Sequence, residues 1–197
     1  GTLMIHHPLY GALQCADVHS DGDSHVTIPV RDEEDLAPDD IIEIARAAAV
    51  YDELDGIPLW EKLQQWAVAP DAPAIADAVL VADATENDIF GSAAWAVLME
   101  QPKLVLFGLQ MAAKAIRFTR YHVATMLPKR RRRTLKRAIG RENVYTVGDE
   151  YPVTVFADKN METYRIGVQA CLALAEAIRE GKYHTHVVVT VAGDALP

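Results

Sequence analysis

The densest cluster of chemically active side chains in the sequence is the basic run 129–137. It consists of Lys129, the four arginines that follow it, Lys136 and Arg137. Guanidinium and ammonium groups at this density bind phosphate or carboxylate groups, so the run is a candidate site for a phosphate or an acidic partner. The alternative is a helix face whose charges are all solvated. We favour this alternative because no aromatic side chain is interleaved with the run.

Other residue types that often carry chemistry do not form a recognisable site. His184 and His186 would share one face of a strand, but no third ligand lies near them in the sequence, so no metal site is predicted. The two cysteines, Cys15 and Cys171, are far apart and lack CxxC spacing. They encode neither a disulfide framework nor a cysteine-ligated cluster, and no catalytic residue is predicted.

Composition limits the class of protein. The 197 residues include 19 Lys and Arg against 28 Asp and Glu, which gives a formal net charge of −9. Such a surface repels nucleic acid and anionic membranes, so neither is expected as a partner. Charged residues interrupt the most apolar stretch, 91–116, which argues against a membrane-spanning helix. The start of the chain does not resemble a signal peptide, and the two cysteines fit a reducing cytoplasm.

Hydrophobic patterning predicts a layered α/β fold. Four short apolar runs rich in β-branched residues indicate strands, at 79–82, 121–127, 144–147 and 187–191. Such runs are typical of a mostly parallel sheet with helices on both faces. Amphipathic spacing also predicts a helix that begins at Pro38. A last helix is expected to have Asn160 as its cap, Gly181 at its end, and a buried stripe of Ile166, Ala170, Ala173 and Ala177.

These patterns divide the chain into two unequal parts. Residues 1–30 are expected to be a short irregular N-terminal arm, or the end of a preceding β module with short strands. Residues 31–197 are expected to form one Rossmann-like α/β domain. A chain of this length buries roughly 70% of its unfolded surface, so it needs no metal or disulfide to hold its core together.

Three stretches, in the same order along the chain, resemble the RnfC family. These are electron-transfer subunits related to the flavin-bearing, NADH-oxidising subunit of respiratory complex I. The clearest stretch is 177–195, where a helix end Ala-Ile-Arg-Glu-Gly leads to the strand Val-Thr-Val-Ala-Gly-Asp-Ala. The second is 50–63, which is similar to the family's loop ending in Gly-Phe-Pro and then Lys-Leu. The third is 81–88, which is similar to a glutamate-bearing strand end.

The resemblance implies a site for FMN and NADH built from Gly56, Pro58, Lys62 and Glu86. Lys62 would reach a phosphate, and Glu86 would make a polar contact at the carboxyl end of a strand, where open α/β sheets bind their ligands. The alternative is a plain turn at Gly56 and Pro58, followed by a solvated lysine on the next helix and a solvated glutamate in a loop.

The loop of this chain lacks the glycines that phosphate binding requires. Tyr51, Glu53 and Leu54 stand where the resemblance places glycines, and Asp52 and Asp55 add carboxylates beside them. A glycine-rich loop offers bare backbone N–H groups to a phosphate. Two unit charges of like sign about 4 Å apart instead repel by roughly 4 kcal/mol at an effective dielectric near 20. We therefore expect an eroded FMN and NADH site, and no cofactor in this domain.

The sequence thus favours a scaffold or docking domain of a soluble RnfC-like electron-transfer protein. Its partners would be other redox proteins or domains of the same complex, and a homo-oligomer is also compatible with the sequence. RnfC-like proteins that accompany soluble reductases such as proline reductase are compatible relatives, because nothing in the sequence requires a membrane. Two alternatives stay open: an active FMN-dependent NADH:acceptor oxidoreductase domain, and a non-redox binding module that uses the basic run 129–137.

Overall fold

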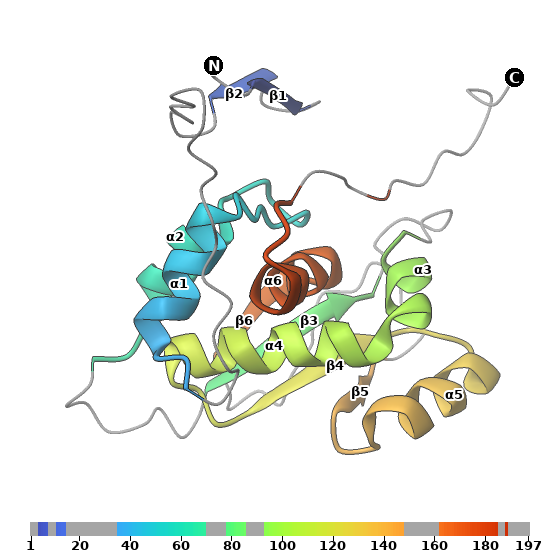
Figure 1. Cartoon of the computed structure of the whole chain (residues 1–197). Helices are drawn as coiled ribbons and strands as arrows, with labels where there is room; N and C mark the ends of the chain where they lie inside the picture. The colour runs from blue at the N-terminus through green and yellow to red at the C-terminus, as the bar shows by residue number, and fades with distance from the viewer. Residues whose placement is uncertain are drawn as a thin grey trace, which may run out of the picture.

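A four-stranded sheet, in which every neighbouring pair of strands is parallel, lies at the centre of the computed structural model (Figure 1). The structure describes residues 4–7, 11–14, 35–69, 78–85, 93–147, 162–184 and 188. The sheet has the order β5-β4-β3-β6, and its strands are β3 (Ala78–Ala84), β4 (Tyr121–Thr125), β5 (Val144–Thr146) and β6 (Glu162–Gly167). The predicted α/β class and its parallel sheet are confirmed.

The central strand β3 is buried along its whole length, as its continuous apolar run predicts. Leu80 and Ala82 face the main core, whereas Val79 and Val81 belong to a second, smaller cluster on the other face. The chain adds β4 and then β5 on one side of β3, and adds β6 on the other side. Open α/β sheets bind ligands outside the carboxyl ends of their strands where the strand order reverses, which here means the ends of β3 and β6.

The helices pack in a layer against the face of the sheet that carries Leu80 and Ala82 (Figure 1). Within this layer α4 and α6 lie side by side, α1 and α2 pack beside them, and α5 covers β5. Helices on the opposite face stay a prediction, because the described helices do not reach it. The helices are α1 (Pro38–Ala47), α2 (Leu59–Trp66), α3 (Ala93–Glu100), α4 (Pro102–Ile116), α5 (Lys129–Ile139) and α6 (Val168–Glu180).

The predicted helix ends are partly correct. Helix α1 begins at Pro38, as predicted, and Gly181 ends α6 in the left-handed conformation with φ +63°. The predicted start of the last helix near Asn160 is wrong, because 162–167 form strand β6 and the helix begins only at Val168. Residues 162–167 form a strand because they pair with β3. This tertiary contact cannot be read from the sequence pattern of the segment alone.

The ends of the chain are described only in part. Strands β1 (Met4–His7) and β2 (Gly11–Gln14) pair antiparallel, in keeping with the expected short strands. Assignment of 1–30 to a preceding module stays a prediction. The predicted strand 187–191 lies outside the described residues, except for residue 188, which is in neither a helix nor a strand. Among the described helices, none combines the length and the apolar character needed to cross a membrane.

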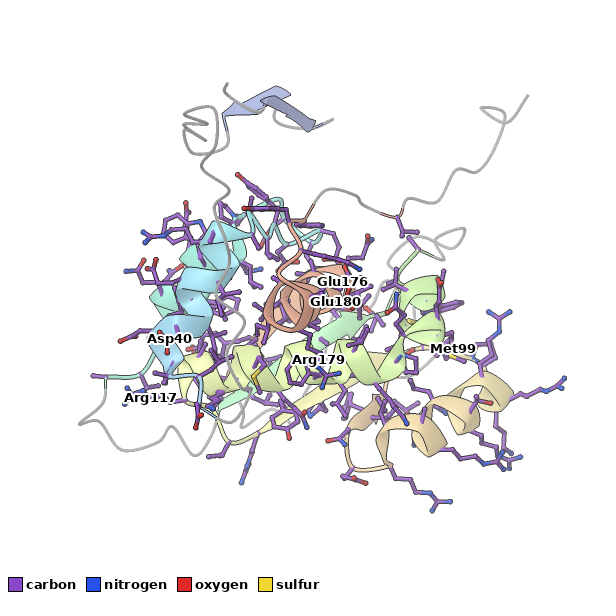
Figure 2. The ribbon with its side chains drawn as sticks, viewed as in Figure 1. Asp40, Met99, Arg117, Glu176, Arg179 and Glu180 are labelled. Carbon is purple, nitrogen blue, oxygen red and sulfur yellow. The ribbon has the colours of Figure 1, made fainter. Side chains whose placement is uncertain are left out.

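Helices α4 and α6 approach each other closely at Gly108. A Cβ atom built on Gly108 would lie 1.8 Å from the carbonyl oxygen of Cys171, so only glycine fits there. Arg179 of α6, which is labelled in Figure 2, also joins the two helices. Its guanidinium carbon lies 3.9 Å from the centre of the ring of Phe107, a residue of α4. This packing holds α6 in place, and the beginning of α6 forms part of the site described below.

The Gly108 contact yields a test based on the sign of a stability change. In a helix free of this contact, replacing Gly with Ala stabilises by roughly 0.5–1 kcal/mol. Because the α4–α6 contact leaves no room for a methyl group, we expect Gly108→Ala to lower the free energy of unfolding instead, by about 1–3 kcal/mol. Urea unfolding followed by circular dichroism measures the change, and a gain in stability would contradict the close packing.

Candidate functional site

The acidic loop, residues 51–58, connects α1 to α2 and lies against the carboxyl end of β6. An isolated antiparallel bridge between Tyr51 and Pro58 closes the loop at its base. Within it, the Gly56 N–H donates to the carbonyl oxygen of Asp52 at 2.8 Å, and Gly56 has φ +72°, a conformation that favours glycine. The turn expected at Gly56 and Pro58 is therefore present, and it is a compact one.

Asp52 is the buried centre of this loop. Its side chain is fully buried, and it accepts hydrogen bonds from the Leu54 N–H at 3.1 Å and the Gly167 N–H at 2.9 Å. Lys62 Nζ lies 2.5 Å from the same carboxylate and 2.8 Å from that of Asp55. Burial raises the pKa of the Asp52 carboxyl group above its usual value, and the charge of Lys62 opposes this rise.

This arrangement corrects the expectations for Lys62. The residue is only 5% exposed, so the expected solvated lysine is wrong. Two of its three N–H donors have carboxylate acceptors, and its ammonium group also lies 5.2 Å from the centre of the Trp66 ring. Asp52 and Asp55 therefore face a cation of their own chain rather than an incoming phosphate. A phosphate at Lys62 would have to compete with both carboxylates for the charge of the ammonium group.

Glu53 occupies the N-terminus of helix α6. Its Oε1 accepts the Gln169 N–H at 2.6 Å, and its Oε2 accepts the Ala170 N–H at 3.0 Å. A Cβ atom on the neighbouring Gly167 would lie 2.0 Å from the carboxylate carbon of Glu53, so only glycine leaves room for it. The beginning of a helix, with its free N–H groups, is a place where proteins bind phosphate. Here the chain places its own carboxylate there.

Glu53 holds its proton unusually tightly for a glutamate. Burial raises its pKa from 4.5 to about 7, and the neighbouring Asp52 carboxylate adds to the rise, whereas the hydrogen bonds from Gln169 and Ala170 oppose it. The group is therefore close to half protonated at neutral pH. Sequence spacing does not reveal this contact, because residues 53 and 169 are far apart in the chain.

A second polar cluster joins the carboxyl ends of β3 and β6. Asp83 is 4% exposed and accepts hydrogen bonds from the Thr85 N–H at 2.9 Å and the Thr85 Oγ1 at 2.6 Å. Arg165 donates to the second oxygen of Asp83 through Nε at 3.1 Å and also through Nη2. Glu86, the predicted polar contact to a cofactor, follows directly in sequence but lies outside the described residues.

His184 is held by hydrogen bonds, and Cys171 is buried. His184 accepts the Tyr51 N–H through Nδ1 at 3.2 Å, and its own backbone N–H donates to Ala48, so it fastens the segment after α6 to the acidic loop. Burial raises the pKa of the Cys171 thiol. In the described ranges no three His, Cys, Asp or Glu side chains are grouped to hold a metal, and His186 lies outside those ranges.

Comparisons with known proteins identify a shared fold. No family model and no curated protein sequence matches the chain. A chain of the NAD+-reducing NiFe hydrogenase in its air-oxidised state superposes with a TM-score of 0.50 and 18% sequence identity over 73% of the present chain. The H2-reduced state of such a hydrogenase gives a TM-score of 0.48, with 16% identity over 73%. The present chain spans about 30% of the length of the first of these chains.

Removal of the lysine charge tests the buried ion pair. In Lys62→Met the Asp52 carboxylate stays buried without its cation, so we expect the free energy of unfolding to fall by about 3–5 kcal/mol. Arg46→Met is the matched control, because Arg46 and Glu43 form an exposed pair whose loss should cost less than about 1 kcal/mol. Equal losses in the two variants, measured by urea unfolding, would contradict the proposed burial.

The raised pKa of Glu53 predicts how stability depends on pH. Between its unfolded pKa near 4.5 and its folded pKa of about 7, the folded protein binds more protons at Glu53 than the unfolded chain does. The contribution of this residue to stability therefore falls as the pH rises from 5 to 8, by about 1–3 kcal/mol.

The Glu53→Gln variant isolates this contribution, because an amide does not titrate. We expect the wild type to lose stability relative to Glu53→Gln as the pH rises across that window, measured by chemical unfolding at several pH values. Parallel pH profiles for the two proteins would show that Glu53 has an ordinary pKa.

Proposed function

We propose that this chain is a scaffold or docking domain of a soluble, cytoplasmic RnfC-like electron-transfer protein whose own FMN and NADH site is closed. The domain would hold redox proteins or other domains of the same complex in place without binding a cofactor itself. The observation that carries the proposal is the position of the Glu53 carboxylate on the N–H groups of Gln169 and Ala170.

Occupation of a helix N-terminus by a carboxylate works against a dinucleotide or flavin phosphate in two ways. The carboxylate uses the backbone N–H donors that a phosphate would need, and its negative charge repels a second anion at the same place. At pH values above 7, where Glu53 is mostly ionised, both effects act together.

The neighbouring cation, Lys62, does not offset the repulsion of a phosphate. Lys62 is the residue that the RnfC resemblance assigns to a phosphate, yet Asp52 and Asp55 already neutralise it. Freeing Lys62 would leave the buried Asp52 carboxylate without its cation, which costs several kcal/mol. The polar groups at the end of β3 are likewise engaged, since Asp83 is bound to Thr85 and Arg165.

The relation to redox proteins is supported by fold and by sequence motifs. The shared fold with a chain of an NAD+-reducing hydrogenase supports an origin among nicotinamide-linked redox subunits. The motif at 177–195 supports the RnfC family in particular. A likeness of fold carries no activity with it, so the preference for a scaffold over an active flavoenzyme domain rests on the occupied helix N-terminus.

Titration with FMN and with NADH tests the proposal. We expect both dissociation constants to be weaker than about 10 μM at pH 8, because micromolar binding requires roughly −8 kcal/mol and the phosphate is repelled rather than held. Flavin fluorescence and calorimetry measure the binding. A dissociation constant below about 10 μM for either compound would show that the domain keeps a working cofactor site.

A variant pair identifies the group that excludes the cofactor. Glu53→Ala frees the N–H groups of Gln169 and Ala170, so FMN should bind at least threefold more tightly than to the wild type. Glu61→Ala removes an exposed glutamate from the first turn of α2 and should leave the affinity unchanged. If the two variants bind FMN equally, the Glu53 carboxylate is not the group that closes the site.

A further inference from the structure

Helix α5 carries a continuous stripe of positive charge along its exposed side. Its members recur at the spacing i, i+3, i+4, i+7 and i+8, which places them on one face of the helix. The opposite face buries Leu135 and Ile139 in the core. At 1.5 Å per residue the stripe is roughly 12 Å long. The basic stripe consists of Lys129, Arg132, Arg133, Lys136 and Arg137, and Arg141 follows the helix on the same side.

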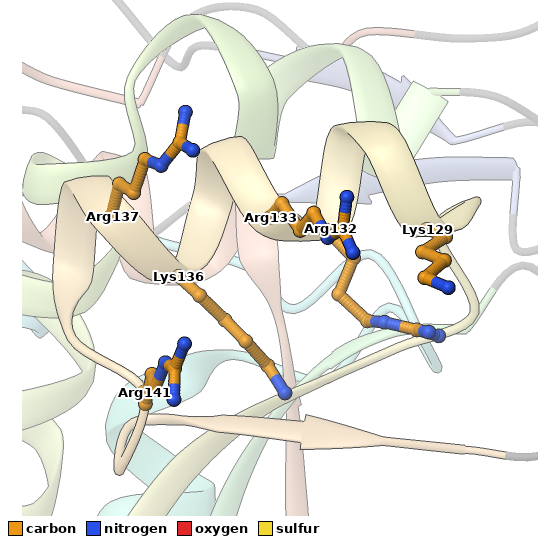
Figure 3. Close-up of a pocket in the computed structure, with 6 residues that line it drawn as sticks. All are labelled: Lys129, Arg132, Arg133, Lys136, Arg137 and Arg141. Carbon is orange, nitrogen blue, oxygen red and sulfur yellow. The ribbon is translucent and has the colours of Figure 1, made fainter.

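The side chains of the stripe surround a hollow in the surface. This cavity has a volume of about 530 Å³, and every described residue that lines it is a lysine or an arginine (Figure 3). The six side chains come from α5 and from the turn after it, and they are Lys129, Arg132, Arg133, Lys136, Arg137 and Arg141. The expected exposure of the basic run is confirmed, since Arg132 is partly exposed and the other four residues of 129–133 are exposed.

These cations form no ion pair in the part of the chain that the structure describes. None of their side chains forms an ion pair there, whereas Lys62, Arg46, Arg165 and Lys182 each pair with a carboxylate. Like charges three and four positions apart destabilise a helix, and cations in its first turn oppose the helix dipole. No side chain caps the N-terminus of this helix. An anionic partner would relieve all of these repulsions at once.

We propose that the basic stripe of α5 is a docking surface for an acidic protein partner. Arginines dominate it, and the planar guanidinium group matches a carboxylate in a two-point contact. A line of cations along a helix fits a line of carboxylates on a partner's helix or strand better than it fits one small anion.

The charge of the remaining chain favours a protein over a nucleic acid. Eight of the 19 lysines and arginines lie in 129–137 or at Arg141, so the 28 Asp and Glu residues dominate the rest of the molecule. A nucleic acid backbone, charged along its whole length, would extend from the stripe into this negative field. A protein with a local acidic patch avoids that conflict. Among the described residues, no aromatic side chain lines the cavity to stack on a base.

The stripe is separate from the closed cofactor site. Helix α5 packs against β5 at one edge of the sheet, whereas the acidic loop contacts Gly167 at the end of β6, on the other edge. Docking at α5 therefore does not depend on whether the domain binds FMN. Failure of one proposal leaves the other intact.

The test uses a fluorescein-labelled peptide of about 14 residues with glutamates at the helical spacing i, i+3, i+4 and i+7. Fluorescence anisotropy measures its binding to the chain at about 50 mM salt and again at about 300 mM. We expect binding at low salt that weakens at high salt, since screening reduces attraction between exposed charges. Absence of binding by the wild type at low salt would overturn the proposal.

Charge reversal locates the binding surface. The triple variant Arg132→Glu, Arg133→Glu and Arg137→Glu should lose at least tenfold in affinity. The matched control, Arg46→Glu, Lys103→Glu and Lys182→Glu, changes the net charge by the same amount at exposed positions outside α5, and should lose less than threefold. Equal losses would show that net charge, rather than the stripe, attracts the peptide. If the triple variant does not fold, the corresponding Gln substitutions take its place.

A competing polyanion decides the class of partner. A single-stranded RNA with the same number of charges as the peptide is titrated under the same conditions. We expect the RNA to bind more weakly than the acidic peptide, because the RNA is repelled by the acidic remainder of the chain. Tighter binding of the RNA, lost in the triple variant, would overturn the assignment to an acidic protein.

Discussion

Burial of the Asp52 carboxylate is the constraint on which the candidate site depends. A fully buried carboxylate is tolerated only where a cation and hydrogen-bond donors replace its water. Lys62 supplies the charge from α2, and the Gly167 N–H supplies a donor from the end of β6. The same group therefore fixes the loop before α2 and positions that loop against α6, so the neighbouring Glu53 meets the helix N-terminus in a defined place.

The acidic loop and the basic stripe use charge in opposite ways. At the acidic loop the carboxylates are satisfied within the chain by Lys62 and by the backbone N–H groups of α6, so no partner is needed there. On α5 the cations repel one another without an internal counter-charge among the described residues. The charges of the acidic loop are thus paired within the chain, whereas those of the basic stripe have no ion-pair partner among the described residues.

Local patterns predicted the fold better than they predicted the site. The sequence predicts strands β3, β4 and β5 and the start of helix α1 at Pro38. It can do so because an apolar run or a helix-start signal lies within one segment of the chain. Strand β6 was missed because its pairing with β3 is a long-range contact. The sequence shows that the loop carries carboxylates. Which groups these carboxylates face depends on Lys62 and on α6, and sequence spacing does not reveal it.

The contact between Gly167 and Glu53 predicts a pattern in the sequences of related proteins. The Glu53 carboxylate occupies the space where a Cβ atom of residue 167 would lie, although the two residues are more than 100 positions apart. Positions 53 and 167 are therefore expected to vary together: where a relative keeps glutamate at the first, the second must stay glycine. A relative with glycine at both positions would leave the helix N-terminus empty. This pair of positions thus distinguishes members of a lineage whose helix N-terminus holds a carboxylate of the same chain from members in which those N–H groups are free.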